Sequence, residues 1–169
     1  VIVDDLFIDI FKKSKIIYEK TNGYFDPSIG LLLDYAGFGP TKNQNTVSED
    51  SLAIILNTVG FDKIDIVDGQ VRKVNNKSKL DFNAIAKGYA VDVISEFLNS
   101  KSIEDYMVDI GGEIRTSGKN HFKDMFWSIA IENPIPNKSD DKFYKKITLQ
   151  NAAIATSGNY RNFRIDSVT

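Results

Sequence analysis

Apolar residues recur at helical spacing along the first part of the chain. Between Val3 and Tyr18 they fall every three or four positions, which places them on one face of an amphipathic helix. Thr21, Asn22 and Gly23 follow, and this composition is typical of the end of a helix. The pattern therefore predicts a first helix that ends near Thr21.

A second helical pattern lies in "TVSEDSLAIILNTVG". Thr46 and Glu49 have the spacing of a capping box, and Gly60 supplies a stop. The apolar face predicted for this helix comprises Leu52, Ile55, Leu56 and Val59.

A third helix is predicted in the segment that begins "KLDFNAIAKGYAVD". A short strand should end near Asp81, and Asn83 is a plausible N-cap. Gly88 weakens a helix by roughly 1 kcal/mol relative to alanine, so we expect a close approach of a ligand or a facing strand at this position. The predicted apolar face comprises Ile85, Tyr89, Val93, Ile94, Phe97 and Leu98.

Shorter segments predict strands. "IDIV" and "VRKV" flank Asp68 and Gly69, a dipeptide favoured in two-residue hairpin turns. After the third helix, "YMVDI", "EIRTS", "FWSIAIE", "FYKKITLQ" and "AAIATS" have strand character, and "NPIPNKSDDK" is the longest loop. No repeat or linker interrupts the pattern. The sequence therefore predicts a single α+β domain over residues 1–169, with packed helices and a mixed or antiparallel sheet.

Composition narrows the functional classes. The net charge of -2 argues against a nucleic-acid partner, and the absence of cysteine excludes thiolate chemistry. A single histidine excludes a multi-histidine metal centre. No apolar run approaches the roughly 18 residues of a membrane span. The chain starts without methionine inside an amphipathic pattern, which is compatible with an upstream segment.

Two segments carry acidic side chains that could contact a ligand. In "TNGYFDPSIG", a turn presents Tyr24 and Phe25 beside the carboxylate of Asp26, although a local cap is the favoured role of Asp26 when this segment is taken alone. In "LDFNAIAKGYAVD", Asp81 ends a strand and Lys87 lies about one turn into the helix. That lysine and the free N–H groups of a helix start could hold a phosphate. The alternative for Lys87 is a solvated helix lysine.

Two later segments are glycine-rich. "VDIGGEIRTSG" has two adjacent glycines after a strand, which suit a tight hairpin or the close approach of a ligand. Taken alone, the hairpin is favoured. "AIATSGNYRNF" ends a strand at Thr156 and Ser157 and then presents Tyr160 and Arg161, for which a simple turn is the alternative.

Together and in this order, these segments resemble the ApbE-type FAD:protein FMN transferases, the flavin-trafficking family. The family patterns include T-G-G-x-F-D-P-T-x-G-P-L, W-G-F-G, D-x-x-x-I-A-K-G-Y-A-x-D, D-I-G-G-E-I-R-x-x-G, I-E-N-P and A-T-S-G-x-Y-R-x-F. Here they stand as "TNGYFDPSIGLLL", "YAGFG", "DFNAIAKGYAVD", "DIGGEIRTSG", "IENP" and "ATSGNYRNF". The match runs from about Thr21 to Phe163, and several segments in one order are far more specific than any single glycine pattern.

The resemblance implies a magnesium-dependent enzyme. Such an enzyme binds FAD and transfers its FMN half to a threonine hydroxyl of a target flavoprotein, releasing AMP. Ala84 falls where the family offers a backbone carbonyl to magnesium, and the catalytic residues stay unassigned. The residues that fall on FAD-contacting positions are Tyr24, Phe25, Asp26, Asp81, Lys87 and Ile154.

The resemblance also implies a partner and a location. Members of the family often modify membrane-bound redox complexes outside the cytoplasm, so an acceptor flavoprotein of such a complex is expected. An exported protein, or one anchored on the extracytoplasmic side of a membrane, is expected for the same reason.

The chain departs from the family pattern at several points. Asn22, Ser28 and Ala36 replace family residues, and these changes are mild. A flavin-contacting segment upstream and a histidine loop and acidic magnesium ligands downstream have no counterpart, because the chain ends in "RIDSVT". We therefore expect the chain to lack N- and C-terminal family segments and to be poorly active alone. His121 matches no functional position and is interpreted as a turn residue.

Three other functions stay open at this point. An FAD pyrophosphatase would use water in place of the threonine hydroxyl and would release FMN and AMP. A non-catalytic flavin-binding module would bind FAD without turnover. A general interaction domain would require the whole series of motifs to be accidental.

Overall fold

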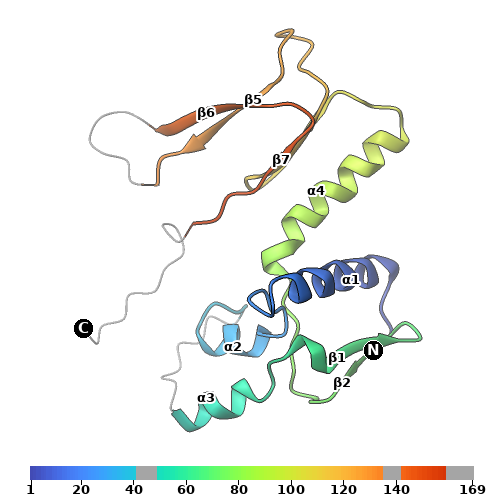
Figure 1. Cartoon of the computed structure of the whole chain (residues 1–169), viewed down its shortest axis with the longest axis vertical. Coiled ribbons are helices and arrows are strands. Elements are labelled where there is room, and N and C mark those ends of the chain that lie inside the picture. Colours follow the sequence, from blue (N-terminus) through green and yellow to red (C-terminus); the bar gives the residue numbers. More distant parts are fainter. Residues whose placement is uncertain (41–48, 135–141, 159–169) are drawn as a thin grey trace. The chain divides into compact units, whose positions relative to one another are not determined.

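The computed structural model describes residues 1–40, 49–134 and 142–158 (Figure 1). The chain divides into two compact units, Val1–Ala86 and Lys87–Thr169. Helices and antiparallel strand pairs are present, which confirms the α+β class. The single domain over residues 1–169 stays a prediction.

Most elements of the first unit are short. They are α1 (Asp5–Lys20), α2 (Gly30–Tyr35), α3 (Glu49–Leu56), a 3₁₀ helix (Phe61–Lys63), β1 (Ile64–Val67) and β2 (Gln70–Lys73). The long helix α4 (Asn83–Ser100) begins at the end of this unit. The later elements are β3 (Tyr106–Ile110), β4 (Glu113–Ser117), β5 (Trp127–Glu132), β6 (Phe143–Leu149) and β7 (Ala153–Ile154). No described helix has the length and apolar character needed to cross a membrane.

Helix α1 confirms the first predicted helix. The carboxylate of Asp4 caps its start by accepting a hydrogen bond of 2.8 Å from the backbone N–H of Phe7. Thr21 is the C-cap, and Asn22 and Gly23 follow with positive φ angles of 50° and 81°. A left-handed backbone cannot continue a right-handed helix, so the chain turns away here.

Aromatic packing holds the first unit together. Phe61 is fully buried, and its ring lies edge-on to Phe11 at a centroid distance of 4.7 Å and to Tyr18 at 5.8 Å. Ile64 at the start of β1 completes the buried cluster. The core of this unit therefore joins α1 to the segment that leads into the hairpin.

The predicted hairpin is confirmed. β1 and β2 pair antiparallel, with Val67 opposite Gln70, so Asp68 and Gly69 form the two-residue turn. Both turn residues have positive φ angles, 51° and 69°, as the Asp-Gly dipeptide predicts.

The second predicted helix is shorter than expected. α3 ends at Leu56, so Val59 is not part of it, and Leu52 and Leu56 are 36% and 51% exposed. Ile55 is the buried member of the predicted face. Thr46 lies outside the described residues. The predicted apolar face was therefore largely wrong: Val59 lies beyond the end of the helix, and Leu52 and Leu56 lie in the helix but are exposed.

The second unit begins with α4 lying against a hairpin. Val91 of α4 packs with Tyr106 and Val108 of β3, and all three are buried. β3 and β4 pair antiparallel. Tyr106 lies opposite Ser117 at one end of the pair, and Ile110 lies opposite Glu113 at the other. Alternate residues of β3 therefore face α4.

The predicted buried face of α4 is also wrong in part. Val91 and Ser95 are buried, whereas Ile94 and Phe97 are 41% and 59% exposed. The face that meets β3 is rotated from the one that apolar periodicity indicated, because β3 offers its apolar residues to Val91. A Cβ built on Gly88 meets no described atom within 4 Å, so no facing strand approaches this glycine.

The remaining strands form two small antiparallel groups. β5 pairs with β6, and β7 adds to β4 through Ile154 opposite Ile114. β7 is only two residues long, although "AAIATS" predicted a longer strand. The short strand near Asp81 is reduced to an isolated parallel bridge between Ile29 and Lys79.

We expect Phe61→Ala to lower the free energy of unfolding by about 3 to 5 kcal/mol, because truncating a buried aromatic leaves a cavity among its partners. Urea unfolding followed by circular dichroism measures the loss. Phe122→Ala is the matched control, since Phe122 is fully exposed and its truncation should change stability by less than about 0.5 kcal/mol. Equal losses in the two variants would contradict the assigned core.

Candidate functional site

The residues predicted to contact a ligand fall into two groups. Tyr24, Phe25, Asp26, Asp81 and Ala84 belong to the first unit. Lys87 and Ile154 belong to the second. Each group is described within its own unit.

Backbone hydrogen bonds bring the two acidic segments of the first group side by side. The N–H of Asp81 donates to the carbonyl of Pro27 at 2.7 Å, and the N–H of Gly30 donates to the carbonyl of Lys79 at 3.0 Å. A Cβ at Gly30 would lie 2.7 Å from that carbonyl oxygen, so this approach requires glycine. The segments that carry Asp26 and Asp81 are therefore neighbours although they are distant in sequence.

Both carboxylates of this group make local backbone contacts. Asp26 Oδ1 accepts a hydrogen bond from the N–H of Ser28 at 2.7 Å. Asp81 Oδ1 accepts from the N–H of Asn83 at 2.8 Å, and its Oδ2 accepts from the Asn83 side chain at 2.9 Å. The prediction of Asn83 as N-cap was wrong, because Asn83 is the first residue of α4 and Asp81 satisfies its N–H. The local-cap alternative for Asp26 has a direct contact in its favour.

Two aromatic residues, Tyr24 and Phe25, precede Asp26 in the turn. Tyr24 is 97% exposed, whereas the N–H of Phe25 donates to the hydroxyl of Thr21 at 3.1 Å. Burial, followed by the negative charges of Asp62 and Asp26, raises the pKa of the Tyr18 hydroxyl. The turn therefore presents one exposed aromatic ring, Tyr24, beside a carboxylate, whereas the sequence predicted a pair of rings and Phe25 is half-buried.

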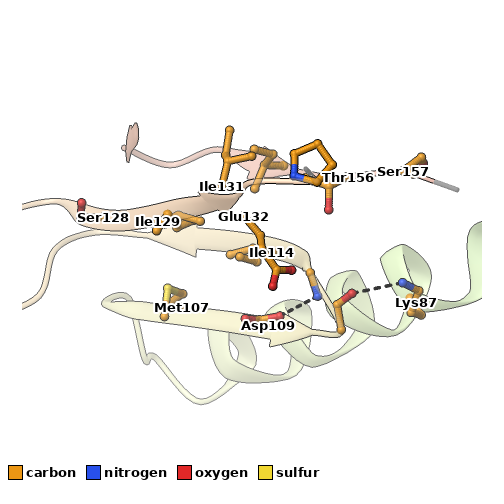
Figure 2. A pocket seen from close by; sticks show the side chains of 16 residues that line it. Lys87, Met107, Asp109, Ile114, Ser128, Ile129, Ile131, Glu132, Thr156 and Ser157 are labelled. Atoms are coloured by element: carbon orange, nitrogen blue, oxygen red, sulfur yellow. Dashed lines mark hydrogen bonds between the residues drawn. The ribbon is translucent and has the colours of Figure 1, made fainter. Parts of the chain in front are cut away.

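The second group lies at a pocket with a volume of about 1100 Å³ (Figure 2). Side chains of β3, β4, β5 and α4 line it, together with the segment after β7. Its apolar wall comprises Met107, Ile114, Ile129, Ile131 and Ile154. Polar side chains at the pocket include Lys87, Asp109, Ser128, Glu132, Thr156 and Ser157.

Two adjacent glycines form one edge of this pocket. Gly111 and Gly112 have φ angles of 60° and 94°, and they make the two-residue turn between β3 and β4. The N–H of Gly112 donates to Asp109 Oδ1 at 3.0 Å, which fixes the turn from β3. The hairpin interpretation is confirmed, and the same turn also lines the pocket.

Lys87 has defined partners on that turn. Its ammonium lies 2.5 Å from Glu113 Oε2 and donates to the carbonyl of Gly111 at 3.2 Å. The lysine side chain is 49% exposed. It is therefore a half-exposed pocket residue with two protein contacts, rather than a fully solvated helix lysine.

Sequence reasoning missed two acidic residues: Asp109, which lines the pocket, and Glu113, which contacts Lys87 from outside it. Both lie in the "DIGGEI" segment, in which only the two glycines were predicted to have a structural or ligand-binding role. The two-residue periodicity of a hairpin places residues before and after the turn near each other, and this signal was available.

The described residues do not by themselves fit a magnesium site. In residues 1–40, 49–134 and 142–158, no three histidine or acidic side chains converge as metal ligands. Ala84, in the first turn of α4, offers one carbonyl oxygen. Magnesium prefers six oxygen ligands in near-octahedral geometry, so further ligands would be needed.

His121 is not among the residues that line the pocket of its own unit. It sits in a turn, as predicted, and its Nε2 lies 2.5 Å from Asp105 Oδ2. This hydrogen bond, with a second one from the N–H of Lys119, lowers the pKa of Asp105. Tyr160 and Arg161 lie outside the described residues.

Comparison with known proteins gives one family. The model of the ApbE family matches residues 1–168. The FAD:protein FMN transferase of Vibrio cholerae is 37% identical over 145 residues, which cover 85% of this chain and 42% of the relative. That of Haemophilus influenzae is 33% identical over 160 residues, covering 92% of this chain and 46% of the relative.

Solved structures of ApbE proteins have the same fold as this chain. The flavin transferase ApbE from Vibrio cholerae superimposes with a TM-score of 0.78 at 32% identity, covering 98% of this chain and 53% of its own. The ApbE protein from Thermotoga maritima gives a TM-score of 0.82 at 31% identity, covering 99% and 54%. The chain spans about half the length of the relatives it matches.

The cap made by Asp26 can be tested separately from any ligand. Asp26→Ala removes the acceptor for the N–H of Ser28 and should cost about 1 kcal/mol of unfolding free energy. Asp26→Asn keeps an oxygen acceptor and should lower the free energy of unfolding by no more than a few tenths of a kcal/mol. Urea unfolding without ligand compares the two variants. An equal loss in both would show that the carboxylate charge, not the cap, stabilises the turn.

Proposed function

Because the chain belongs to the ApbE family, we propose that the protein containing it transfers the FMN part of FAD to an acceptor protein. The names of the relatives, FAD:protein FMN transferase, support this reaction. The observation that carries the proposal is the pocket of the second unit, where an apolar wall lies beside a lysine ammonium and a glycine turn.

FAD combines features that suit this pocket. Its ring systems are flat and largely apolar, and the wall around Ile114, Ile129 and Ile154 offers matching surface. Its two phosphates are anionic, and the ammonium of Lys87 offers a charge-assisted contact at the pocket edge. Glycines at the turn leave no side chain between the backbone and a phosphate.

The first unit also carries residues on FAD-contacting positions of the family. We propose that Tyr24, Phe25, Asp26 and Asp81 contact FAD, as the family motifs imply. A carboxylate accepts more hydrogen bonds than one, so Asp26 and Asp81 can bind a ribose hydroxyl while they cap the backbone. The exposed ring of Tyr24 can stack on a flat ligand.

In the proposed reaction a threonine hydroxyl of the acceptor attacks the phosphorus of the FMN half. The new phosphoester bond forms as the bond to the AMP phosphate breaks, so AMP leaves and the hydroxyl proton is released. Magnesium, when bound, would polarise the phosphoryl group, and Ala84 would offer it a carbonyl oxygen. The chain's own residues bind and orient FAD, and Lys87 offsets phosphate charge.

The family resemblance also supports the nature of the acceptor. We propose that the acceptor is a flavoprotein of a membrane redox complex and that it is modified on the extracytoplasmic side of the membrane.

Transfer can be measured directly on the complete gene product that contains this chain. Incubation with FAD, magnesium and a threonine-containing acceptor should add one FMN to the acceptor, detected as a covalent mass increase. Substitution of the acceptor threonine by alanine should abolish the increase. Release of free FMN and AMP with an unmodified acceptor would contradict transfer and would favour hydrolysis by water.

Lys87→Ala should lower the affinity for FAD at least tenfold, because a charge-assisted contact to phosphate is worth about 1.5 to 3 kcal/mol. Titration calorimetry with FAD measures the change. His121→Ala is the control, since His121 lies in a turn and is not among the residues that line the pocket. Unchanged affinity in Lys87→Ala would return this lysine to the solvated alternative.

A further inference from the structure

We propose that Glu113 is a positioning residue that holds the ammonium of Lys87 at the edge of the pocket, ready for the phosphates of a dinucleotide. This inference rests on the proposed function, because it names a residue that acts on FAD binding through Lys87. No motif reasoning assigned a role to Glu113.

The contact between the two side chains is unequal. Glu113 Oε2 lies 2.5 Å from Lys87 Nζ, and the glutamate side chain is 15% exposed against 49% for the lysine. Glu113 Oε2 is buried and makes no hydrogen bond within the described part of the chain. The lysine ammonium is therefore the charge that compensates this buried oxygen, and the carboxylate is the fixed partner of the pair.

Glu113 reaches the lysine from outside the pocket. Lys87, Gly111 and Gly112 line the pocket, whereas Glu113 does not. In the hairpin Glu113 is opposite Ile110, so it lies on the side of the sheet that faces α4. A residue in that place can orient the lysine without occupying the space of a ligand.

A second contact defines the position of the ammonium. The carbonyl of Gly111 accepts a hydrogen bond from Lys87 Nζ at 3.2 Å. An ammonium has three N–H donors, so a carboxylate on one side and a carbonyl on another leave donor capacity for an anion. A lysine side chain loses considerable rotamer freedom when it binds a ligand, and holding it beforehand reduces that loss.

The same helix and strand carry a comparable ion pair that does not line the pocket. Arg115 Nη1 lies 2.6 Å from Asp92 Oδ1, and it links β4 to α4 as the pair of Glu113 and Lys87 does. Neither Arg115 nor Asp92 lines the pocket. If these pairs only fasten the helix to the sheet, removing either carboxylate should have similar effects.

A carboxylate beside the lysine also has an opposing effect. Its charge offsets that of the ammonium and repels phosphate, so its removal could strengthen FAD binding. Glutamine separates the two effects, because it keeps an oxygen near Lys87 and removes the charge. Positioning predicts that alanine weakens binding and glutamine does not.

The test compares Glu113→Ala, Glu113→Gln and Asp92→Ala in the complete gene product, with the dissociation constant for FAD measured by calorimetry. We expect Glu113→Ala to weaken binding about fivefold, a coupling typical of side chains in direct contact. Glu113→Gln and Asp92→Ala should stay within about twofold of the wild type, or bind more tightly in the case of glutamine. In a Lys87→Met background, Glu113→Ala should cause no further loss, because its effect passes through the lysine.

The outcomes separate this inference from the proposed function. A wild-type protein that does not bind FAD would overturn the proposed function and this inference with it. A wild type that binds FAD, with unchanged or tighter binding in Glu113→Ala, would overturn the inference alone. An equal loss in Asp92→Ala, or a full loss from Glu113→Ala in the Lys87→Met background, would also overturn it by showing a general structural effect.

Discussion

The tight turn at Gly111 and Gly112 determines the geometry of the pocket in the second unit. Two consecutive positive φ angles are needed to reverse the chain in two residues, and glycine adopts them without the strain that a side chain imposes. The turn then fixes three things at once: the Gly111 carbonyl that faces Lys87, the N–H that Asp109 binds, and the register that places Glu113 after the turn. A bulkier residue here would disturb the pocket edge and the lysine together.

The first unit uses a backbone contact for a similar purpose. Hydrogen bonds between the Pro27–Gly30 segment and the Lys79–Asp81 segment hold the two segments side by side, although they form no regular sheet. The acidic side chains of Asp26 and Asp81 therefore belong to neighbouring segments. Gly30 permits this approach because a Cβ would collide with the carbonyl of Lys79. In both units, therefore, glycine permits the backbone arrangement on which the charged side chains depend: a close approach at Gly30 and a tight turn at Gly111 and Gly112.

Local signals in the sequence predicted the parts of the fold that local physics controls. The first helix and both hairpin turns follow from periodicity and from residues that tolerate positive φ, and all three are confirmed. The buried faces of α3 and α4 were predicted poorly, because the choice between Val91 and Ile94 depends on which residues β3 presents. The sequence of a helix alone does not show which residues of a neighbouring strand will face it.

The site was predictable to a similar degree. Motifs identified Lys87 and the glycines, since their order along the chain is specific, but they did not reveal that Glu113 accompanies the lysine. That pairing arises when α4 lies against β4, and it depends on tertiary packing rather than on any spacing in the sequence. The same packing produces the pair of Asp92 and Arg115, five residues further along the helix and two along the strand.

The structural and functional interpretations of Asp26 and Asp81 are compatible. A carboxylate has two oxygens with about four acceptor sites, and each of these side chains uses only some of them on backbone and side-chain N–H groups. Holding one oxygen on the backbone restricts the rotamer of the side chain, so the remaining acceptor sites point in a defined direction. A cap of this kind would orient a carboxylate for the proposed ligand, as the proposed role of Glu113 would orient Lys87. The local contact that first favoured a purely structural role is therefore also what a ligand-binding carboxylate would need.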